Sequence, residues 1–551
     1  MKKILEISAL AALILLSASC AKSRLEQMQL AKDVTIQCTP EVLEIKGGKI
    51  PATVSVTCPK GYFHPKATMD VTPVLVYEGG ELTGSVLQYQ GEKVKDNFKV
   101  ISAAGATVSE RLSFPYKEGC EKARLELRGV IHYNGKDYPV DAIKVADGCI
   151  ATYQLADLGG VFSVKPDGYK AVIERSTEAR ILYDVNSDRV KPSELETYAM
   201  DGYRYRLDQL QKDERTTVKG TQIVAYASPE GGKEYNDKLS DKRAGSAQKA
   251  WGTIAKEAAG IEVTGVEVQS MGQDWEGFRE AVEKSNIEDK DLILRVLSMY
   301  SDPAVRESEI RNMAQIYSEI NKKVFPELRR ARFVTSSEFR NYDDEELLTL
   351  AEQGLDSFDE PSLLRLAAIS KDAEHKEALY KYAIGKYDSD TARYNLAILY
   401  LRQGKTSLGG AYLGKIKNPD ADVLNATGVV AMRNDDYAEA AACFEKAGNA
   451  KAKENMVILN IIKGDYAAAS KAAEGMKGCN ATIAKLLNGE LEAASEALTC
   501  KCPKSNYIRA IIAARKGQTA EARKYLEDAC SKKASLKERA ARDIEFAALA
   551  E

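Results

Sequence analysis

The feature that most constrains the fold of this chain is a strand-like stretch that leads through a short loop into a long helix. Residues 221–226, Thr-Gln-Ile-Val-Ala-Tyr, are largely β-branched or apolar and favour a strand. A turn-rich Ser-Pro-Glu-Gly-Gly loop follows, and residues 234–257 predict a helix. Leu239 and Ala247 fall on a face of that helix suited to packing on a sheet. This order indicates a domain of the α/β class.

The same helix carries a polar face near its start. Asn236, Ser240 and Arg243 stand at positions i, i+4 and i+7 and therefore share one side of the helix. The free amide groups of the helix N-terminus point to the same place. An arginine there can clamp a carboxylate through two parallel hydrogen bonds. The pattern predicts a site for an acidic ligand.

Residues 225–244 resemble, without a gap, the loop-to-helix signature of the OmpA C-terminal family, the periplasmic peptidoglycan-binding module. The positions in register are Gly231, Tyr235, Asn236, Leu239, Ser240, Arg243 and Ala244. The resemblance covers residues 180–280 and implies an α/β sandwich. In the family an arginine and an aspartate hold the charged diamino acid of the peptidoglycan stem peptide, and Arg243 stands at the arginine position.

One position departs from that signature, because Ser228 replaces the acidic residue of the family. A serine hydroxyl accepts a hydrogen bond from an ammonium but brings no charge, and charge-assisted bonds are about twice as strong as neutral ones. Glu230 is the candidate for the missing carboxylate, although Pro229 fixes the local backbone and could aim it elsewhere. The alternative is that Arg243 only braces the loop and the ligand has been lost.

We place this α/β domain at residues 161–335. Its further elements are a strand at 179–184, a helix that starts at 192 and ends at about 212, and a strand at 261–268. Residues 287–332 are expected to form a helical extension of the same domain.

Residues 1–20 are a targeting segment. Two lysines precede an apolar run that is too short to span a bilayer, and Ser-Ala-Ser-Cys follows. The segment resembles a bacterial lipoprotein signal, which implies lipidation of Cys20 and a chain anchored to the outer membrane, facing the periplasm. The alternative is an ordinary secretory signal.

Residues 21–160 predict an all-β domain. Short β-branched runs such as 34–38, 52–58 and 71–77 are separated by glycine-containing turns. Asn134-Gly135 lies between two such runs and is typical of a tight hairpin. We expect an immunoglobulin-like sandwich with a binding or spacer role.

Residues 340–551 are alanine-rich and predict helices. Residues 425–447 resemble a tetratricopeptide repeat, with Gly428 and Phe444 among its small and aromatic positions. Tyr437, Tyr466, Leu491 and Thr519 take equivalent positions in successive copies, at steps shorter than the usual 34 residues. We expect a helical solenoid that binds unidentified protein partners, or alternatively a plain helical bundle.

The charge of the chain and the spacing of its histidines and cysteines give little support for an enzyme or a nucleic-acid-binding protein. The net charge of −3 gives no reason to expect nucleic acid as a partner. Basic clusters at residues 322–323 and 329–332 are better explained by a solvated helix face than by nucleic acid. The three histidines lie far apart and have no metal-ligand spacing. Cys500 and Cys502 do not form a Cys-x-x-Cys motif, which disfavours redox catalysis, and the pairing of the other cysteines is left open. We expect neither a cofactor nor a catalytic metal.

The sequence therefore predicts a non-catalytic envelope lipoprotein with three domains. It would bind peptidoglycan through Arg243, Asn236, Ser228, Glu230 and Ser240, and protein partners through its repeats. The alternative is an envelope assembly or secretion scaffold whose OmpA-like domain no longer binds peptidoglycan. A wall hydrolase would require a catalytic carboxylate pair or metal site, and no motif for either stands out.

Overall fold

The computed structural model describes residues 24–259 and 265–549. The signal at 1–20 with Cys20, and the first four residues of the strand expected at 261–268, lie outside that range. The chain divides into two compact units. One combines the chain up to Pro166 with the chain from Tyr380 onward, and the other is Asp167–Leu379. Within the described residues, no helix combines the length and the apolarity needed to cross a bilayer.

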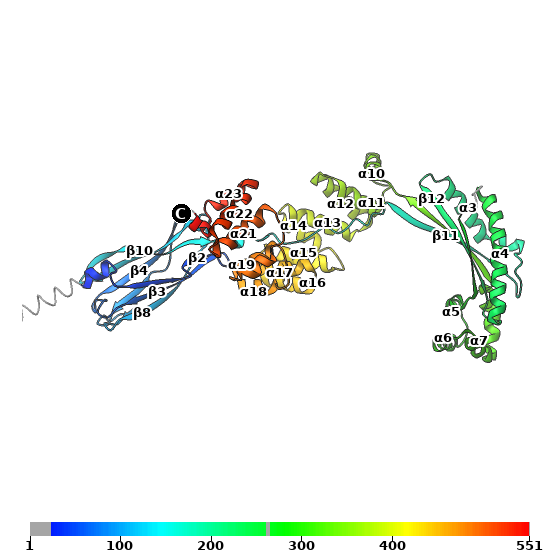
Figure 1. Cartoon of the computed structure of the whole chain (residues 1–551), viewed down its shortest axis with the longest axis horizontal. Coiled ribbons are helices and arrows are strands. Elements are labelled where there is room, and N and C mark those ends of the chain that lie inside the picture. Colours follow the sequence, from blue (N-terminus) through cyan, green and yellow to red (C-terminus); the bar gives the residue numbers. More distant parts are fainter. Residues whose placement is uncertain (1–23, 260–264, 550–551) are drawn as a thin grey trace, which may run out of the picture. The chain divides into compact units, whose positions relative to one another are not determined.

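The N-terminal region is β-rich and forms two sheets (Figure 1). The three-stranded sheet has the order β1-β3-β8, with β1 at Thr35–Thr39, β3 at Lys49–Cys58 and β8 at Ala106–Pro115. The larger sheet has the order β2-β10-β9-β4-β6-β7, formed by Val42–Glu44, Lys136–Ile150, Arg124–Tyr133, Thr68–Tyr77, Leu87–Gly91 and Lys99–Ile101, with β5 (Gly80–Thr83) paired to β4. Asn134 and Gly135 both have positive φ and form the predicted hairpin turn between β9 and β10.

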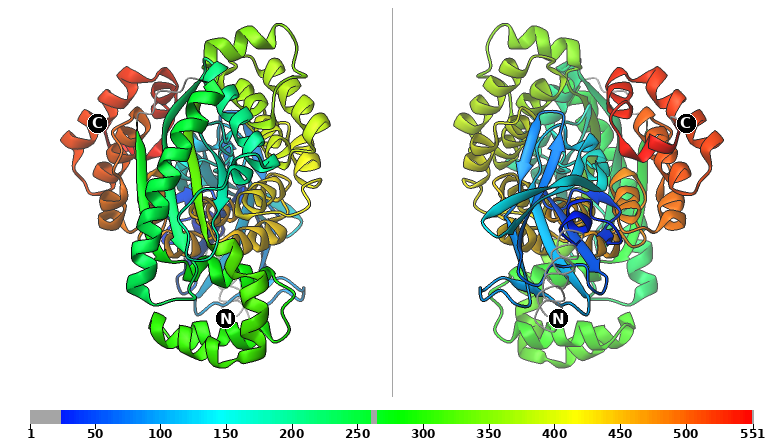
Figure 2. Two further views of the ribbon diagram at one scale, coloured as in Figure 1. Left: turned by 90° about the vertical axis from the view of Figure 1, so that its right-hand side faces the viewer. Right: turned by 90° about the vertical axis from the view of Figure 1, so that its left-hand side faces the viewer.

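The middle unit is of mixed α/β type. Its sheet has the order β11-β14-β12-β13, formed by Val172–Leu182, Arg330–Arg340, Thr216–Ala227 and Val266–Gln273. Helices α3 (Tyr198–Lys212) and α4 (Lys233–Ala259) cover one face of it (Figures 1 and 2). Met200, Trp251, Ile223 and Phe333 contribute to the buried core between helices and sheet. The strand at 221–226 and the helix after it form as predicted.

Two elements of this unit differ from the expectation. The helix expected from residue 192 is interrupted, because α2 (Pro192–Leu195) stops and Thr197 caps the start of α3 by accepting a hydrogen bond from the Met200 amide. The helical extension ends at Leu328, and β14 then runs through the middle of the sheet. The inward positions of β14 include Thr335 and Ser337, so its apolar alternation is too weak to indicate a strand.

The helices before β14 form a small bundle with its own core. They are α5 (Trp275–Lys284), α6 (Lys290–Met299), α7 (Pro303–Asn312), α8 (Ala314–Lys323) and α9 (Phe325–Leu328). Phe278, Ile293, Leu297 and Phe325 are buried at its centre. After the bundle, β14 re-enters the sheet and pairs antiparallel with both β11 and β12. Helices α10 (Asp344–Ala351) and α11 (Glu360–Ile369) follow β14, and α12 (Ala373–Tyr387) crosses the boundary between the units.

The C-terminal region is a succession of helix pairs resembling tetratricopeptide repeats. The pairs are α13 and α14 (Asp390–Arg402, Thr406–Leu413), α15 and α16 (Ala421–Arg433, Tyr437–Ala447), α17 and α18 (Ala450–Lys463, Tyr466–Ala472), α19 and α20 (Cys479–Leu487, Leu491–Ala497), and α21 and α22 (Pro503–Arg515, Thr519–Lys532). Tyr437, Tyr466, Leu491 and Thr519 each begin the second helix of a pair. The equivalence predicted for these four positions is thereby confirmed.

The N-terminal sheets pack against these repeats within one unit. The Tyr466 hydroxyl donates to the Ile45 carbonyl at 2.5 Å. Gly47 and Gly464 bring their backbones so close that a Cβ on Gly464 would lie 2.6 Å from the Gly47 nitrogen. Both glycines have positive φ, which favours glycine, so neither position tolerates a larger residue. Residues at opposite ends of the sequence therefore share one interface.

Candidate functional site

The loop between β12 and α4 is held by its own polar side chains. The side-chain amide of Asn236 donates to the backbone carbonyls of Ser228 (3.2 Å) and Gly231 (2.7 Å). The Ser228 hydroxyl donates to the Glu230 carboxylate at 2.7 Å. Asn236 and Ser228 are both buried. Asn236 therefore fixes the loop conformation, while Ser228 and Glu230 hold each other.

Arg243 lies beneath this loop with only 1 % of its surface exposed. Its guanidinium donates to three backbone carbonyls, those of Ser187 (2.9 Å), Tyr226 (3.0 Å) and Asp184 (3.2 Å). These bonds use three of its five N–H groups. Burial lowers the pKa of Arg243 to about 10. No ion pair of Arg243 with a carboxylate occurs among the described residues, so it is a buried cation without a counter-charge in contact.

Glu230, the candidate for the missing carboxylate, already has a partner. Arg329 donates to its two oxygens from Nε (2.8 Å) and from a terminal nitrogen (3.1 Å). Both side chains are largely buried. A paired carboxylate of this kind is less available to an ammonium group, since a competing cation must share it with the arginine. Arg329 directly precedes β14, and no local sequence pattern connects it with the loop.

Four of the five predicted binding residues meet at one cavity of about 200 Å³. Its lining consists of Val185, Asn186, Ser228, Glu230, Gly231, Tyr235, Asn236, Leu239 and Arg243. Ser240, the fifth predicted residue, lies outside this lining. It is fully buried, contacts the Ser270 hydroxyl at 2.6 Å and accepts a hydrogen bond from the Gly272 amide at 3.1 Å. The cavity combines the buried Arg243 cation, three neutral polar side chains, an exposed tyrosine and the Glu230 carboxylate. Because Arg329 neutralises that carboxylate, the unpaired charge at the cavity is that of Arg243, which suits a small ligand with a carboxylate.

A larger polar groove of about 600 Å³ lies elsewhere in this unit. Two of its four acidic residues pair with arginines of the groove: Asp274 with Arg330 at 2.8 Å and Glu178 with Arg332 at 2.5 Å. Burial raises the pKa of Asp274, which also caps α5 by accepting from the Gly277 amide. The arginines Arg330 and Arg332 of this groove each have a carboxylate partner, whereas Arg243 has none among the described residues.

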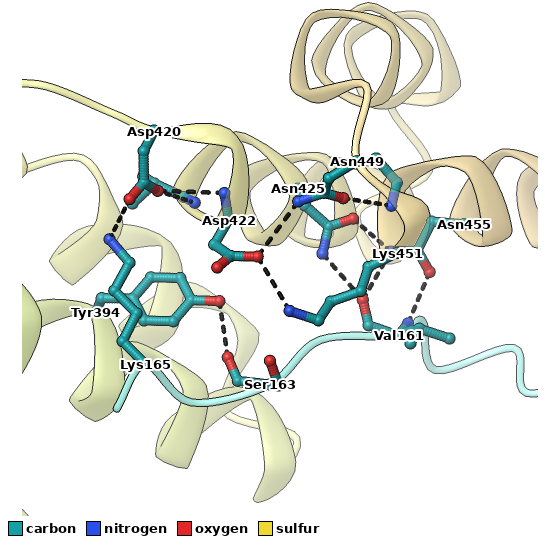
Figure 3. Close-up of polar contacts among 12 residues, drawn as sticks. Val161, Ser163, Lys165, Tyr394, Asp420, Asp422, Asn425, Asn449, Lys451 and Asn455 are labelled. Atoms are coloured by element: carbon teal, nitrogen blue, oxygen red, sulfur yellow. Dashed lines mark hydrogen bonds and ion pairs between the residues drawn. The ribbon is translucent and has the colours of Figure 1, made fainter. Parts of the chain in front are cut away.

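The repeats carry a second polar array, which binds the chain's own residues 157–165. Asn455 accepts from the Val161 amide (2.6 Å) and donates to the Val161 carbonyl (2.8 Å), to which Asn425 also donates (3.0 Å) (Figure 3). Asn395 contacts the amide and the carbonyl of Lys165 in the same way, at 2.7 and 3.1 Å. Such contacts recognise an extended backbone and not its side chains.

This array, the asparagine ladder, consists of Asn395, Asn425, Asn455 and Asn480, one from the first helix of each of four successive pairs. Asn480 accepts from the Asp157 amide at 2.8 Å. All four are at most 5 % exposed. The Tyr394 hydroxyl adds a bond to the Ser163 carbonyl (2.9 Å), as Figure 3 shows. The repeats therefore hold residues 157–165 of this chain, which form a turn up to Gly160 and have no regular secondary structure after it. The sequence alone did not predict this role.

The observed architecture is that of a multidomain protein with a β-rich N-terminal region, a mixed α/β middle and a helical C-terminal region like tetratricopeptide repeats. No protein-family model matches the chain, and no curated protein matches it. Among solved structures it is similar to a tetratricopeptide repeat protein from Parabacteroides merdae ATCC 43184, with 16 % identity and a TM-score of 0.30. That match covers 36 % of this chain and 90 % of the other.

Proposed function

We propose that the protein is a non-catalytic cell-envelope component whose OmpA-like α/β unit binds an acidic group of the peptidoglycan stem peptide at Arg243. The observation that carries this proposal is the buried guanidinium, which faces a cavity of about 200 Å³ and has no carboxylate partner among the described residues. An unpaired buried charge is unfavourable, so an anion that enters the cavity is attracted to that charge. Its two remaining N–H groups suit the two oxygens of a carboxylate.

The rest of the chain would place this site in the envelope. In this proposal Cys20 carries a lipid that anchors the chain to the outer membrane, on the periplasmic side, and the β-rich region is an immunoglobulin-like spacer. The repeats bind protein partners. Because the asparagine ladder already holds residues of this chain, partners would use other faces of the repeats. The protein would thereby connect membrane, cell wall and a protein partner.

Co-sedimentation of the mature full-length chain with purified sacculi tests the proposal. The wild-type protein should sediment with the sacculi. Arg243→Ala should bind them at least about tenfold more weakly, since a charge-assisted bidentate contact is worth about 1.5–3 kcal/mol. Arg204→Ala is a matched control, because Arg204 also donates to a backbone carbonyl, that of Leu195, but does not line the cavity. Equal retention of folded Arg243→Ala and wild type would contradict the proposal.

A second function, an envelope assembly or secretion scaffold without peptidoglycan binding, is favoured by a different observation. Ser228 brings no charge, and the Glu230 carboxylate is engaged by Arg329. The ammonium end of the diamino acid would then have no free anionic partner at the cavity. Absence of wild-type retention on sacculi, together with loss of function on deletion of the repeats, would support this alternative.

A further inference from the structure

Three cysteines meet at the start of two repeat helices. Cys479 is the first residue of α19, Cys500 lies in the loop after α20, and Cys502 directly precedes α21. The Sγ atoms of Cys479 and Cys500 are 3.9 Å apart, and those of Cys500 and Cys502 are 3.4 Å apart. Among the residues that the structure describes, this group has the spacing of ligands to one metal ion, with all three sulfurs within 4.8 Å of one another.

Two helix N-termini and one hydroxyl group surround the three sulfurs. The N-termini of α19 and α21, which span nine and thirteen residues, direct their free amide groups and positive dipole ends to this place. The fully buried Ser505 hydroxyl contacts Cys479 at 3.5 Å and Cys502 at 3.2 Å, and it also contacts Cys500.

The backbone around the cluster is fixed. Arg509 donates to the carbonyls of Cys500 (2.7 Å) and Leu498 (3.2 Å), which holds the loop between α20 and α21. The Gly478 amide donates to the Ala497 carbonyl at 2.8 Å and so ties the start of α19 to the end of α20. Cys502 is exposed, which leaves an entry from solvent. The three sulfurs are therefore held near one another before any ligand arrives.

We propose that Cys479, Cys500 and Cys502 form a binding site for a thiophilic metal ion, with Zn²⁺ as the ion best suited to it. A tetrahedral zinc site with Zn–S bonds of about 2.3 Å has sulfurs about 3.8 Å apart, close to the spacing observed here. Water or the Ser505 hydroxyl supplies the fourth position. On binding, each cysteine loses its proton to solvent and no redox change takes place. The cation also removes the repulsion between three neighbouring thiolates.

A disulfide is the competing arrangement, and it explains less of the geometry. It would bring two sulfurs to about 2.05 Å and leave the third cysteine without a role. It would also give no reason for Ser505 to contact all three sulfurs. The site belongs to the helical repeats, and it does not depend on peptidoglycan binding at Arg243.

The test uses the mature full-length chain, purified in reductant and freed of metal by a chelator. We expect it to take up one equivalent of Zn²⁺, and Co²⁺ as a probe should give the absorption of a tetrahedral thiolate complex. Zn²⁺ should protect three of the nine described cysteines from alkylation. Cys479→Ser and Cys502→Ser should each lower the Zn²⁺ affinity by more than about 100-fold, since even outer contacts of metal ligands are worth 10- to 100-fold.

Cys530→Ser is the matched control, because Cys530 lies in α22 and outside the cluster, and it should leave Zn²⁺ uptake unchanged. Circular dichroism establishes that each variant is folded. Unchanged Zn²⁺ affinity in folded Cys479→Ser would overturn the proposal. So would a chain that binds no Zn²⁺ after full reduction but yields a peptide cross-linked through two of the three cysteines when isolated without reductant.

Discussion

The asparagine ladder places unusual demands on single residues. Asn455 is fully buried and makes three hydrogen bonds, two to the backbone of Val161 and one to Asn425. An asparagine offers a donor and an acceptor on one short side chain, which matches the amide and carbonyl of one extended residue. Aspartate lacks the donor, and leucine lacks both groups. The identity of this residue is therefore set by the backbone that it holds.

We predict that Asn455→Ala lowers the free energy of unfolding by about 2 kcal/mol, because the Val161 amide is left buried without a partner. Urea denaturation followed by circular dichroism measures the change. Asn488→Ala, at an exposed asparagine that contacts Glu490, should change stability by less than about 0.5 kcal/mol. Similar effects of the two substitutions would contradict the role of the ladder.

Two histidines of the β-rich region should respond to pH with opposite signs. Burial, together with the charges of Arg24 and Lys66, lowers the pKa of His64 below 6.5. Its contribution to stability is complete above 6.5 and is lost as the pH falls through its folded-state pKa. The hydrogen bond to Asp137 raises the pKa of His132. Its contribution is complete below 6.5 and is lost as the pH rises through its folded-state pKa.

Unfolding free energies measured between about pH 5 and pH 8 test both signs, because histidine titrates in this range. His64→Gln should flatten the fall in stability on the acid side, and His132→Gln should flatten the fall on the basic side. His132 is more exposed than His64, so solvent screening makes its effect the smaller one. If the unfolding free energy of His64→Gln falls at low pH as steeply as that of wild type, another group controls this pH dependence.

The candidate site illustrates which single residues a sequence can assign. Asn236, Ser228 and Arg243 follow from a local loop-to-helix pattern, and the structure brings them to one cavity. Ser240 shares their helix face by spacing but packs against Ser270. Arg329 could not be assigned, because it meets Glu230 only after the chain has returned through α5–α9. Local periodicity specifies a face of a helix, whereas contacts between distant segments depend on the sheet order.

At the scale of elements, the helix pairs depend on close approach at small residues. Gly428 of α15 lies against α16, and a Cβ there would be 2.5 Å from Cε1 of Phe444. A small residue at this position was expected from the resemblance to tetratricopeptide repeats. The strand β14 was not expected, since its buried side includes hydroxyl groups. Repeats are predictable because each copy is built from local contacts, whereas β14 owes its position to strands on both sides.

We predict that Gly428→Ala destabilises the repeats by about 1–3 kcal/mol, because the added methyl group overpacks the contact with Phe444. Gly385→Ala is the matched control in α12. A Cβ at Gly385 meets no atom within 4 Å, so this substitution should stabilise the helix by about 0.5–1 kcal/mol. Thermal and urea unfolding of both variants give the comparison. Destabilisation of equal size in both would show that packing against Phe444 is not the cause.

At the scale of the whole molecule, one unit is assembled from the two ends of the sequence. Val161 and Phe162 pack against the cores of the repeats, and the asparagine ladder holds the backbone around them. The repeats therefore lack part of their core when the N-terminal part of the chain is missing. The sequence predicts the two regions as separate domains and carries no signal for this interdependence, because asparagines in helices are common and do not indicate what they contact.

We predict that a fragment of residues 380–551 is less stable than the same region in the full chain. A synthetic peptide of residues 155–166 should bind the fragment and raise its Tm, since a ligand that binds only the folded state stabilises it. A peptide N-methylated at Val161 and Lys165 loses the two amide donors and should not raise the Tm. Equal effects of both peptides would point to apolar packing alone.

The ladder also imposes an order of events on a nascent chain. Residues 157–165 leave the ribosome long before the helices that carry Asn395, Asn425, Asn455 and Asn480. The β-rich region and the inserted α/β unit can mature during that delay, because their sheets pair within each region. The last step is then the formation of contacts between residues 157–165 and the asparagine ladder. These residues are far apart in the sequence, and contacts of this kind form slowly. Until the C-terminal helices arrive, the segment remains accessible to proteases and to chaperones that recognise extended chains.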